Sequence, residues 1–137
     1  GGADLLLSFE LCEGARRIPY LKKGGFAVVN TASIIPVSAA LGKADYDAEK
    51  ITKYISENSN AIFIDADRLA RECGSFRAVN TVLIGAACGL GILDLSKDSI
   101  EQSIKKNIKA KYLDLNIKAF RSGMKTTEEM REKCKAI

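Results

Sequence analysis

Three short, almost continuously apolar runs recur along the first half of the chain, and helical spacing follows each of them. The runs are Asp4–Phe9, Phe26–Asn30 and Ala61–Asp65. Apolar runs without polar alternation are typical of strands buried on both faces, as in parallel sheets. Strands that alternate with helices predict an α/β fold. We expect a three-layer, Rossmann-like domain with a mainly parallel sheet and a helical C-terminus.

End signals mark the helices of the first half. Glu10–Leu21 carries apolar residues at helical spacing. The tetrapeptide Lys22–Gly25 then predicts a cationic last turn and a left-handed stop. Asp47 is expected to cap a helix that runs to about Asn58. Between these helices, Pro36 makes the stretch 31–40 irregular or at most an edge strand.

The second half contains no further strand signal and is expected to be helical. A short helix over Ala66–Cys73 should end at Gly74. The apolar stretch Phe76–Leu90 predicts a buried helix, and Ser96 is expected to cap the helix after it. Two amphipathic helices are predicted to complete the chain, over Ala110–Ser122 and Thr127–Lys135.

The number of strands limits how complete the domain can be. A doubly wound sheet usually has about five strands, and three buried strands leave apolar faces and edges uncovered. We therefore expect residues 1–137 to be the C-terminal part of a single larger domain from which an N-terminal segment is missing.

The residue types present exclude several kinds of chemistry. The chain of 137 residues has no histidine, the commonest general base and metal ligand. Its four cysteines, at positions 12, 73, 88 and 134, include no close pair and give neither a zinc nor an iron–sulfur ligand pattern. No catalytic residue and no metal site are predicted. The cysteines are expected to be free thiols in the cytoplasm.

Neither a membrane nor a nucleic acid is an expected partner. The segment Ala78–Ile92 contains Asn80 and Thr81 and is too short for a membrane span. The formal charge of +4 comes largely from lysines of the C-terminal third. These lysines alternate with acidic residues such as Glu101 and Asp114, which favours a solvated helical surface over a nucleic-acid footprint.

Four residues are candidates for contact with a ligand or a partner subunit: Asn30, Thr31, Asp65 and Asn80. Asn30, Thr31 and Asp65 lie at strand ends, where α/β folds place ligand contacts. For Asn30 and Thr31, a functional role and a turn-forming role are equally open. Capping of the following helix is favoured for Asp65, and for Asp67 beside it. Asn80 is polar in an apolar helix, so if it is buried it needs a hydrogen-bond partner.

Glycines give no nucleotide-binding motif. No phosphate-binding loop occurs, and the sequence Gly89-Leu-Gly91 lies at a helix end rather than after a strand. Gly85 and Gly89 are one helical turn apart, which favours close packing of the helix on a neighbouring element over a cofactor contact.

The order of these pieces resembles a known family. In sequence they read ADLLLSFE, IPYLKKGG, VVNT, IIPVSAALGKADY and IFIDADRLARECGSFRAVNTVLIGAACGLGIL. Together they are similar, over about residues 1–95, to the gamma-type domain of 2-oxoacid:ferredoxin oxidoreductases, above all the small (beta) subunit of the indolepyruvate type. The glycine-rich G-x-G-G-Q-G segment with which members begin does not occur here, so ligand contacts made through it cannot be placed.

The resemblance implies an accessory subunit. Thiamine diphosphate, iron–sulfur clusters and CoA are expected in the complex but not on this chain. The implied partners are a large catalytic subunit and, through it, ferredoxin. This chain would complete the assembly and help to shape the CoA or substrate channel. The alternatives are a stand-alone nucleotide- or CoA-binding module, an NAD(P)-dependent oxidoreductase, which the missing fingerprint disfavours, and a structural interaction protein.

Overall fold

The computed structural model describes residues 1–32, 40–42 and 46–135. Most of the stretch 31–40, predicted to be irregular, lies outside these residues. The chain divides into two compact units, Gly1–Ile64 and Asp65–Ile137.

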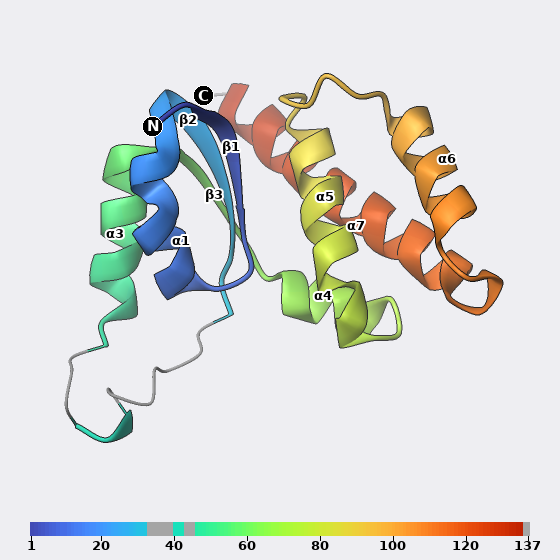
Figure 1. The fold of residues 1–137 in the computed structure, drawn as a ribbon, viewed down its shortest axis with the longest axis horizontal. Helices are drawn as coiled ribbons and strands as arrows, with labels where there is room; N and C mark the ends of the chain where they lie inside the picture. The colour runs from blue at the N-terminus through green and yellow to red at the C-terminus, as the bar shows by residue number, and fades with distance from the viewer. Residues whose placement is uncertain (33–39, 43–45, 136–137) are drawn as a thin grey trace. The chain divides into compact units, whose positions relative to one another are not determined.

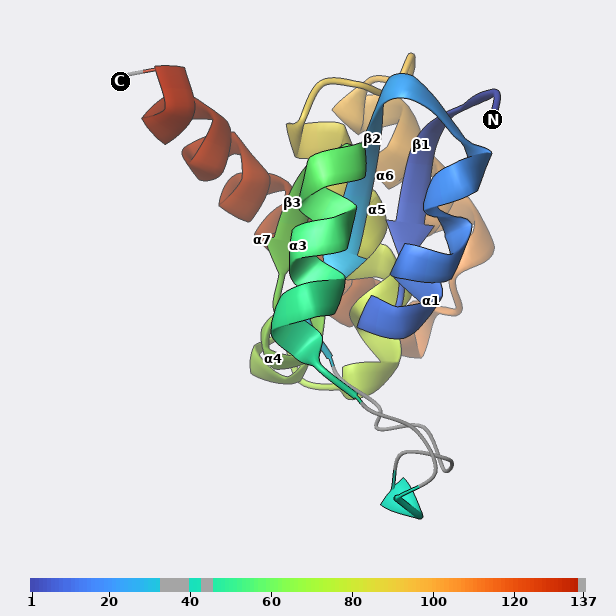
Figure 2. The ribbon, with the colours of Figure 1, turned by 90° about the vertical axis from the view of Figure 1, so that its left-hand side faces the viewer.

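The first unit is a parallel sheet covered by helices. Its three strands pair in the order β1-β2-β3. The regular pairing of β1 with β2 begins at Leu5 opposite Phe26, and the pairing of β2 with β3 begins at Phe26 opposite Asn60. Helices α1 and α3 lie on the same face of the sheet (Figures 1 and 2). The elements are β1 (Ala3–Ser8), α1 (Leu11–Arg17), the 3-10 turn η1 (Ile18–Tyr20), β2 (Leu21–Asn30), α3 (Ala48–Asn58) and β3 (Asn60–Ile64).

The core of the first unit explains this arrangement. Alternate residues of β2, Ala27 and Val29, pack with Leu11 of α1 and Ile55 of α3, and all four side chains are buried. The α3 helix begins where the sequence predicts, because the Asp47 carboxylate accepts hydrogen bonds of 3.1 Å from the backbone N–H groups of Glu49 and Lys50. The three predicted strands and this helix are confirmed.

The predicted helix over Glu10–Leu21 is too long. The α1 helix ends at Arg17, and Pro19, which has no amide hydrogen, lies in the 3-10 turn that follows. Lys22–Gly25 therefore belong to β2 and do not end a helix. Gly24 does have a positive φ of 76°. It lies in an irregularity of the ladder, where β1 advances from Ala3 to Leu5 while β2 advances from Leu21 to Phe26.

The second unit is helical, which confirms the predicted helical C-terminus. In Figure 1, α5 packs along α7, and α6 lies beside them. Ser96 caps α6 as predicted, accepting a 3.1 Å hydrogen bond from the backbone N–H of Ser99. The elements are α4 (Ala66–Glu72), η2 (Phe76–Ala78), α5 (Val79–Gly89), α6 (Lys97–Asn107) and α7 (Ala110–Lys135).

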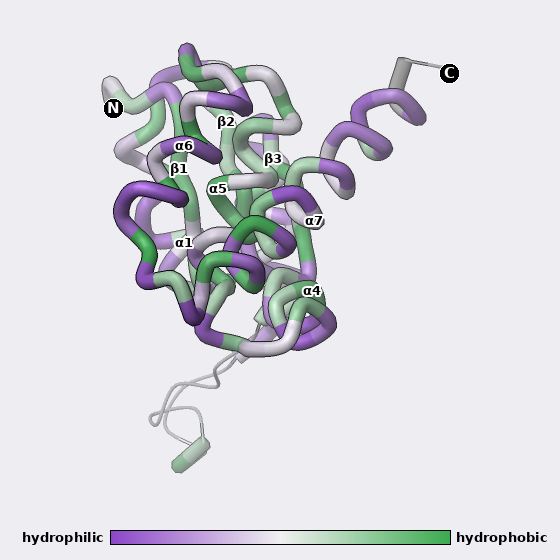
Figure 3. Tube along the Cα trace, turned by 90° about the vertical axis from the view of Figure 1, so that its right-hand side faces the viewer, coloured by the Kyte–Doolittle hydropathy of each residue, from purple (hydrophilic) through white to green (hydrophobic). Residues whose placement is uncertain are grey.

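The C-terminal segment forms one helix where the sequence predicts two. The α7 helix continues through Gly123, the residue that follows the expected end at Ser122. A Cβ atom on Gly123 would overlap the backbone carbonyl of Val82 in α5. The glycine thus permits close contact between helices and does not end one. Figure 3 shows α5 as largely hydrophobic and the last turns of α7 as hydrophilic.

The predicted close packing of Gly85 and Gly89 is confirmed, and their neighbour is α7. A Cβ atom on Gly85 would overlap the carbonyl of Phe120, and one on Gly89 would overlap that of Met124. Thr127, fully buried in α7, donates a 2.8 Å hydrogen bond to the carbonyl oxygen of Ala86.

Among the helices that the structure describes, none combines the length and the apolar character needed to cross a membrane.

Replacing Gly85 with alanine should destabilise the protein. Alanine favours an isolated helix by about 1 kcal/mol over glycine. Here the added methyl group meets backbone atoms, so α5 and α7 must separate, and overpacking of this kind costs about 1–3 kcal/mol or more. Urea denaturation followed by circular dichroism measures the difference. Gly2→Ala is the control, because a Cβ built there has no atom within 4 Å beyond the glycine and its two chain neighbours. Equal stability of both variants would contradict the packing argument.

Candidate functional site

Asn30, the first candidate residue, ends β2 and is only 1% exposed. Its Nδ2 donates a 3.1 Å hydrogen bond to the carbonyl of Phe9, which follows β1. Its Oδ1 accepts a 3.4 Å hydrogen bond from the backbone N–H of Ala32. The side chain therefore ties together the two segments that leave β1 and β2. These contacts favour the turn-forming role, and a ligand contact by Asn30 stays a prediction.

Thr31 lies beside Asn30, but its side chain is exposed. Its backbone N–H donates a 2.9 Å hydrogen bond to the carbonyl of Ile64, which extends the pairing of β2 with β3 by one residue. The backbone of Thr31 is thus fixed while its side chain points to solvent. Of this pair, Thr31 is the residue free to contact a molecule outside the chain.

The capping interpretation of Asp65 is supported by its contacts. Asp65 is the N-cap of α4, and its Oδ1 accepts a 2.9 Å hydrogen bond from the backbone N–H of Arg68. Its Oδ2 lies 3.8 Å from Nε of the same arginine. A contact of Asp65 with a ligand stays a prediction.

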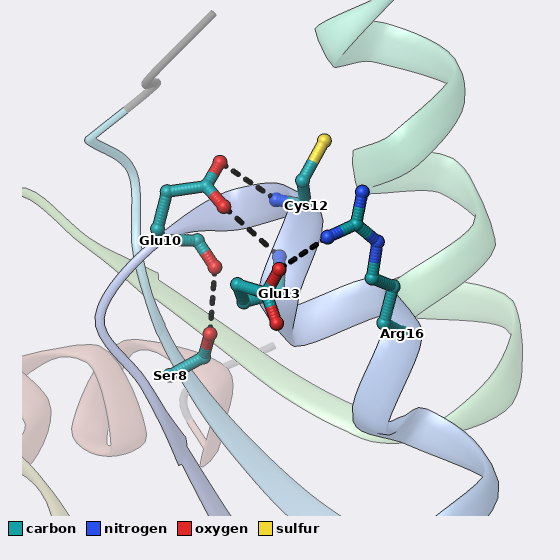
Figure 4. A network of polar contacts seen from close by, with 5 residues as sticks. All are labelled: Ser8, Glu10, Cys12, Glu13 and Arg16. Atoms are coloured by element: carbon teal, nitrogen blue, oxygen red, sulfur yellow. Dashed lines mark hydrogen bonds and ion pairs between the residues drawn. The ribbon is translucent and has the colours of Figure 1, made fainter. Parts of the chain in front are cut away.

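The turn after β1 carries a polar network that the sequence did not reveal (Figure 4). Both carboxylate oxygens of Glu10 accept hydrogen bonds from the first turn of α1, at 2.8 Å from the N–H of Cys12 and 3.0 Å from that of Glu13. The Ser8 hydroxyl donates a 2.6 Å hydrogen bond to the carbonyl of Glu10. Glu13 in turn pairs with Arg16. Glutamate is an uncommon N-cap, so sequence preference alone gives little signal for it.

The Glu10 carboxylate determines what can bind at this turn. In dinucleotide-binding α/β folds, a phosphate sits where a helix begins after a strand. Here the chain's own carboxylate already accepts from those N–H groups, and its charge repels a second anion. Burial and the nearby Glu10 charge also raise the pKa of the Cys12 thiol, which disfavours the reactive thiolate. The backbone N–H groups of Cys12 and Glu13 are thus occupied by the chain's own Glu10 carboxylate.

The second unit contains two adjoining hollows, which we name together the α5–α6 groove. The first has a volume of about 610 Å³ and includes Arg77, Lys109, Tyr112 and Asn116 in its lining. The second has a volume of about 490 Å³ and is mainly apolar. Both are lined by Asn80, Thr81, Asn107 and Ile108.

Asn80, the last candidate, is exposed and lies where the two hollows meet. Its Oδ1 accepts a 2.9 Å hydrogen bond from the backbone N–H of Thr81. The buried polar group of α5 is instead Thr81, whose hydroxyl donates a 2.6 Å hydrogen bond to Oδ1 of Asn116. Asn116 donates through Nδ2 to the carbonyl of Tyr112, at 2.9 Å. No local pattern predicts this link, because its partners are 35 residues apart in the sequence.

An ion pair between a buried carboxylate and an exposed guanidinium links α6 to α7 beside the groove. Glu101 of α6 is 6% exposed, and its two carboxylate oxygens accept hydrogen bonds of 2.7 and 2.8 Å from Nε and Nη2 of Arg121 in α7. These hydrogen bonds hold the pKa of Glu101 below its usual value, and Arg121's charge adds to the effect. The sequence placed Glu101 on a solvated surface. That prediction is wrong, because a long-range partner satisfies the charge.

The cysteines and acidic residues give no sign of redox or metal chemistry among the residues that the structure describes. Cys12, Cys73 and Cys88 are free thiols. Across the part of the chain that the structure describes, no cluster of three or more His, Cys, Asp or Glu side chains is placed to hold a metal ion.

The chain thus consists of a parallel α/β unit with capped helix starts and a helical unit that contains an open groove. Residues 1–126 match the pyruvate ferredoxin/flavodoxin oxidoreductase family, and the chain belongs to this family. It is similar to the indolepyruvate oxidoreductase subunit IorB of Pyrococcus horikoshii, with 40% identity over 95% of this chain. The IorB subunit of Thermococcus kodakarensis is 38% identical over the same share.

Solved structures support the same fold. The gamma subunit of a keto/oxoacid ferredoxin oxidoreductase from Geobacter sulfurreducens PCA matches with a TM-score of 0.67 and 22% identity, covering 91% of this chain and 64% of that one. A 2-oxoglutarate:ferredoxin oxidoreductase from Magnetococcus marinus matches with a TM-score of 0.66 and 20% identity, covering 95% of this chain and 20% of that one. The chain spans 66% of the length of each of the two IorB relatives.

The two strand-end candidates should respond differently to truncation. Asn30→Ala leaves the carbonyl of Phe9 without its buried donor, which costs about 1–3 kcal/mol. Thr31→Ala removes an exposed side chain and should change the free energy of unfolding by less than about 0.5 kcal/mol. Chemical denaturation of both variants provides the comparison. A neutral Asn30→Ala variant would show that its hydrogen bonds do not hold the turn.

The Glu101–Arg121 pair should make stability depend on pH in a defined direction. The folded pKa of Glu101 lies below that of the unfolded chain, about 4.3. The pair thus stabilises the fold fully above that value, and this contribution is lost as the pH falls through the folded pKa. Wild type should exceed Glu101→Gln in stability at pH 7, with a gap that narrows below about pH 4.3.

Urea denaturation between pH 7 and pH 3 measures this gap. The control is Glu132→Gln, which removes an exposed carboxylate of α7. A gap between wild type and Glu101→Gln that stays constant over the whole pH range would contradict the role given to the ion pair.

Proposed function

We propose that this chain is part of the accessory subunit of an indolepyruvate-type 2-oxoacid:ferredoxin oxidoreductase. The observation that carries the proposal is the 40% identity to an indolepyruvate oxidoreductase subunit over 95% of the chain. Residues 1–137 would be the C-terminal part of one gamma-type domain. The complete enzyme would oxidise and decarboxylate an aryl pyruvate in the cytoplasm, with CoA as acyl acceptor and ferredoxin as electron acceptor.

In this proposal the chemistry lies on the large partner subunit. Thiamine diphosphate and the iron–sulfur clusters would bind there, and ferredoxin would dock there. The composition of this chain supports such a division, since it has no histidine and no closely spaced cysteines. So does the turn after β1, where the Glu10 carboxylate takes the place that a phosphate would need. A stand-alone nucleotide- or CoA-binding module is correspondingly less well supported.

The strand ends are then the first candidate contact with the large subunit or its substrate. Asn30 holds the turn that carries Phe9, whose aromatic side chain is 55% exposed. Exposed Thr31 follows Asn30 directly. An exposed aromatic ring beside a hydroxyl, both on a fixed backbone, suits contact with a protein surface.

Activity should appear only when both subunits are present. The full-length natural subunit that contains this chain is mixed with its cofactor-loaded large subunit, and CoA-dependent oxidation of indolepyruvate is followed with methyl viologen as acceptor. We expect turnover in the mixture and none from the small subunit alone, because residues 1–137 contain no histidine and no closely spaced cysteines that could hold a redox group.

Two measurements test the assignment further. Turnover by the isolated small subunit with added thiamine diphosphate or NAD would contradict the accessory role. Comparing indolepyruvate with pyruvate and 2-oxoglutarate in the mixture tests the substrate class, since a preference for either short acid would contradict the indolepyruvate assignment while leaving the accessory role intact.

A further inference from the structure

The apolar half of the α5–α6 groove is open to solvent. Its lining includes Ile84, Leu93, Leu95, Ile100, Ile104 and Ile108. Ile84 on α5 is 39% exposed, and Leu95 in the segment before α6 is 60% exposed. Exposed apolar side chains gathered around one hollow, rather than scattered singly, mark a surface that binds a partner. Their arrangement between helices suits the reception of another helix.

The charged side chains that line the other half of the groove are all positive. Arg77 and Lys109 line it, and none of the described residues that line either hollow is acidic. The nearby carboxylate of Glu101 is held by Arg121 and does not balance these charges. Asn80 and Asn116 add amide groups at the same end. A partner that fits must therefore bring apolar side chains to one half and negative charge to the other.

We propose that the α5–α6 groove receives an amphipathic helix of the large subunit, with an apolar stripe against Ile84 and Leu95 and one or more carboxylates against Arg77 and Lys109. This inference rests on the proposed function, which supplies the partner. The apolar half provides buried area, and the basic half sets the direction in which the helix lies, because reversing it would place carboxylates on isoleucine and leucine side chains.

The position of the ion pair supports the same surface. Glu101 and Arg121 fix α6 against α7, and so hold Ile100 and Ile104 of α6 opposite Ile84 of α5. Thr81 and Asn116 link α5 to α7 at the polar end. The groove is thus held by side chains at both ends, and a partner helix would meet a preformed surface.

Binding of the full-length small subunit to the cofactor-loaded large subunit tests the inference. Leu95→Asp should weaken this binding by about tenfold or more, because it would bury an unpaired charge. Lys109→Glu should weaken it by a similar factor, and only this loss should shrink as the salt concentration rises. Tyr54→Asp on α3 and Lys118→Glu on α7 are the matched controls, since both side chains are exposed and neither lines the groove. Circular dichroism and melting temperature establish that each variant is folded.

The outcomes separate the inference from the proposed function. If the large subunit binds wild type and all four variants equally well, the groove is not the docking surface, and the accessory role stands. If the large subunit does not bind wild type, both proposals fail. Sedimentation of the small subunit alone provides a further arm: a dimer that Leu95→Asp disrupts, with binding to the large subunit unchanged, would assign the groove to a second copy of this chain and overturn the inference.

Photo-crosslinking in the assembled complex tests the chemistry of the occupant. A benzoylphenylalanine at position 95 should capture one segment of the large subunit, and the same group at position 54 should not. We expect the captured peptide to be helical, with apolar residues at helical spacing and an acidic residue near one end. Capture of a segment without acidic residues, or of none, would overturn the inference.

Discussion

Gly85, Gly89 and Gly123 allow the backbones of α5 and α7 to meet with no side chain between them. The other features of the second unit depend on this contact. It places the hydroxyl of Thr127 within 2.8 Å of the carbonyl of Ala86. It also leaves α7 as one uninterrupted helix, long enough to contact both α5 and α6. The α6 helix is then fixed by a charge pair, and the groove is the space that these three helices leave open.

The first unit is held by a different principle. Its parallel strands bring their carboxyl ends to one edge, where backbone groups leave the ladder and need new partners. Glu10 satisfies the first turn of α1, and Asn30 satisfies the carbonyl of Phe9. Polar residues that look functional by position thus hold the edge itself. Among the described residues at this edge, Phe9 and Thr31 have exposed side chains that a partner could contact.

The features predicted correctly from the sequence are those with local causes. Apolar runs gave the three strands, and Asp47 and Ser96 marked two helix starts through hydrogen bonds to residues two or three positions away. The helix ends that were predicted wrongly depend on a contact that is distant in the sequence, or on a residue that interrupts the apolar spacing of a helix. Pro19 ended α1 early, within a segment whose apolar spacing continued. Gly123 has the appearance of a helix stop until its contact with α5 is known.

The candidate site divides in the same way. Asn30 and Asp65 could be located because a strand end is a local feature, but whether such a residue binds a ligand or its own backbone depends on the folded turn. The polar link from Thr81 to Asn116 and the pair of Glu101 with Arg121 span 35 and 20 residues, and no periodicity connects their members.

The pair of Glu101 with Arg121 also helps to explain why a groove lined by isoleucine and leucine can stay open in water. Side chains that flank an apolar hollow gain free energy by closing over it, at about 25 cal/mol per Å² of apolar surface removed from water. Closure by a movement of α6 relative to α7 would strain the two hydrogen bonds that join Glu101 to Arg121. Separating the two would leave a carboxylate that is only 6% exposed without its hydrogen-bond donors, which is unfavourable. The pair that looks like a stabilising contact thus also keeps the apolar surface accessible, and a partner helix can bury that surface without moving α6.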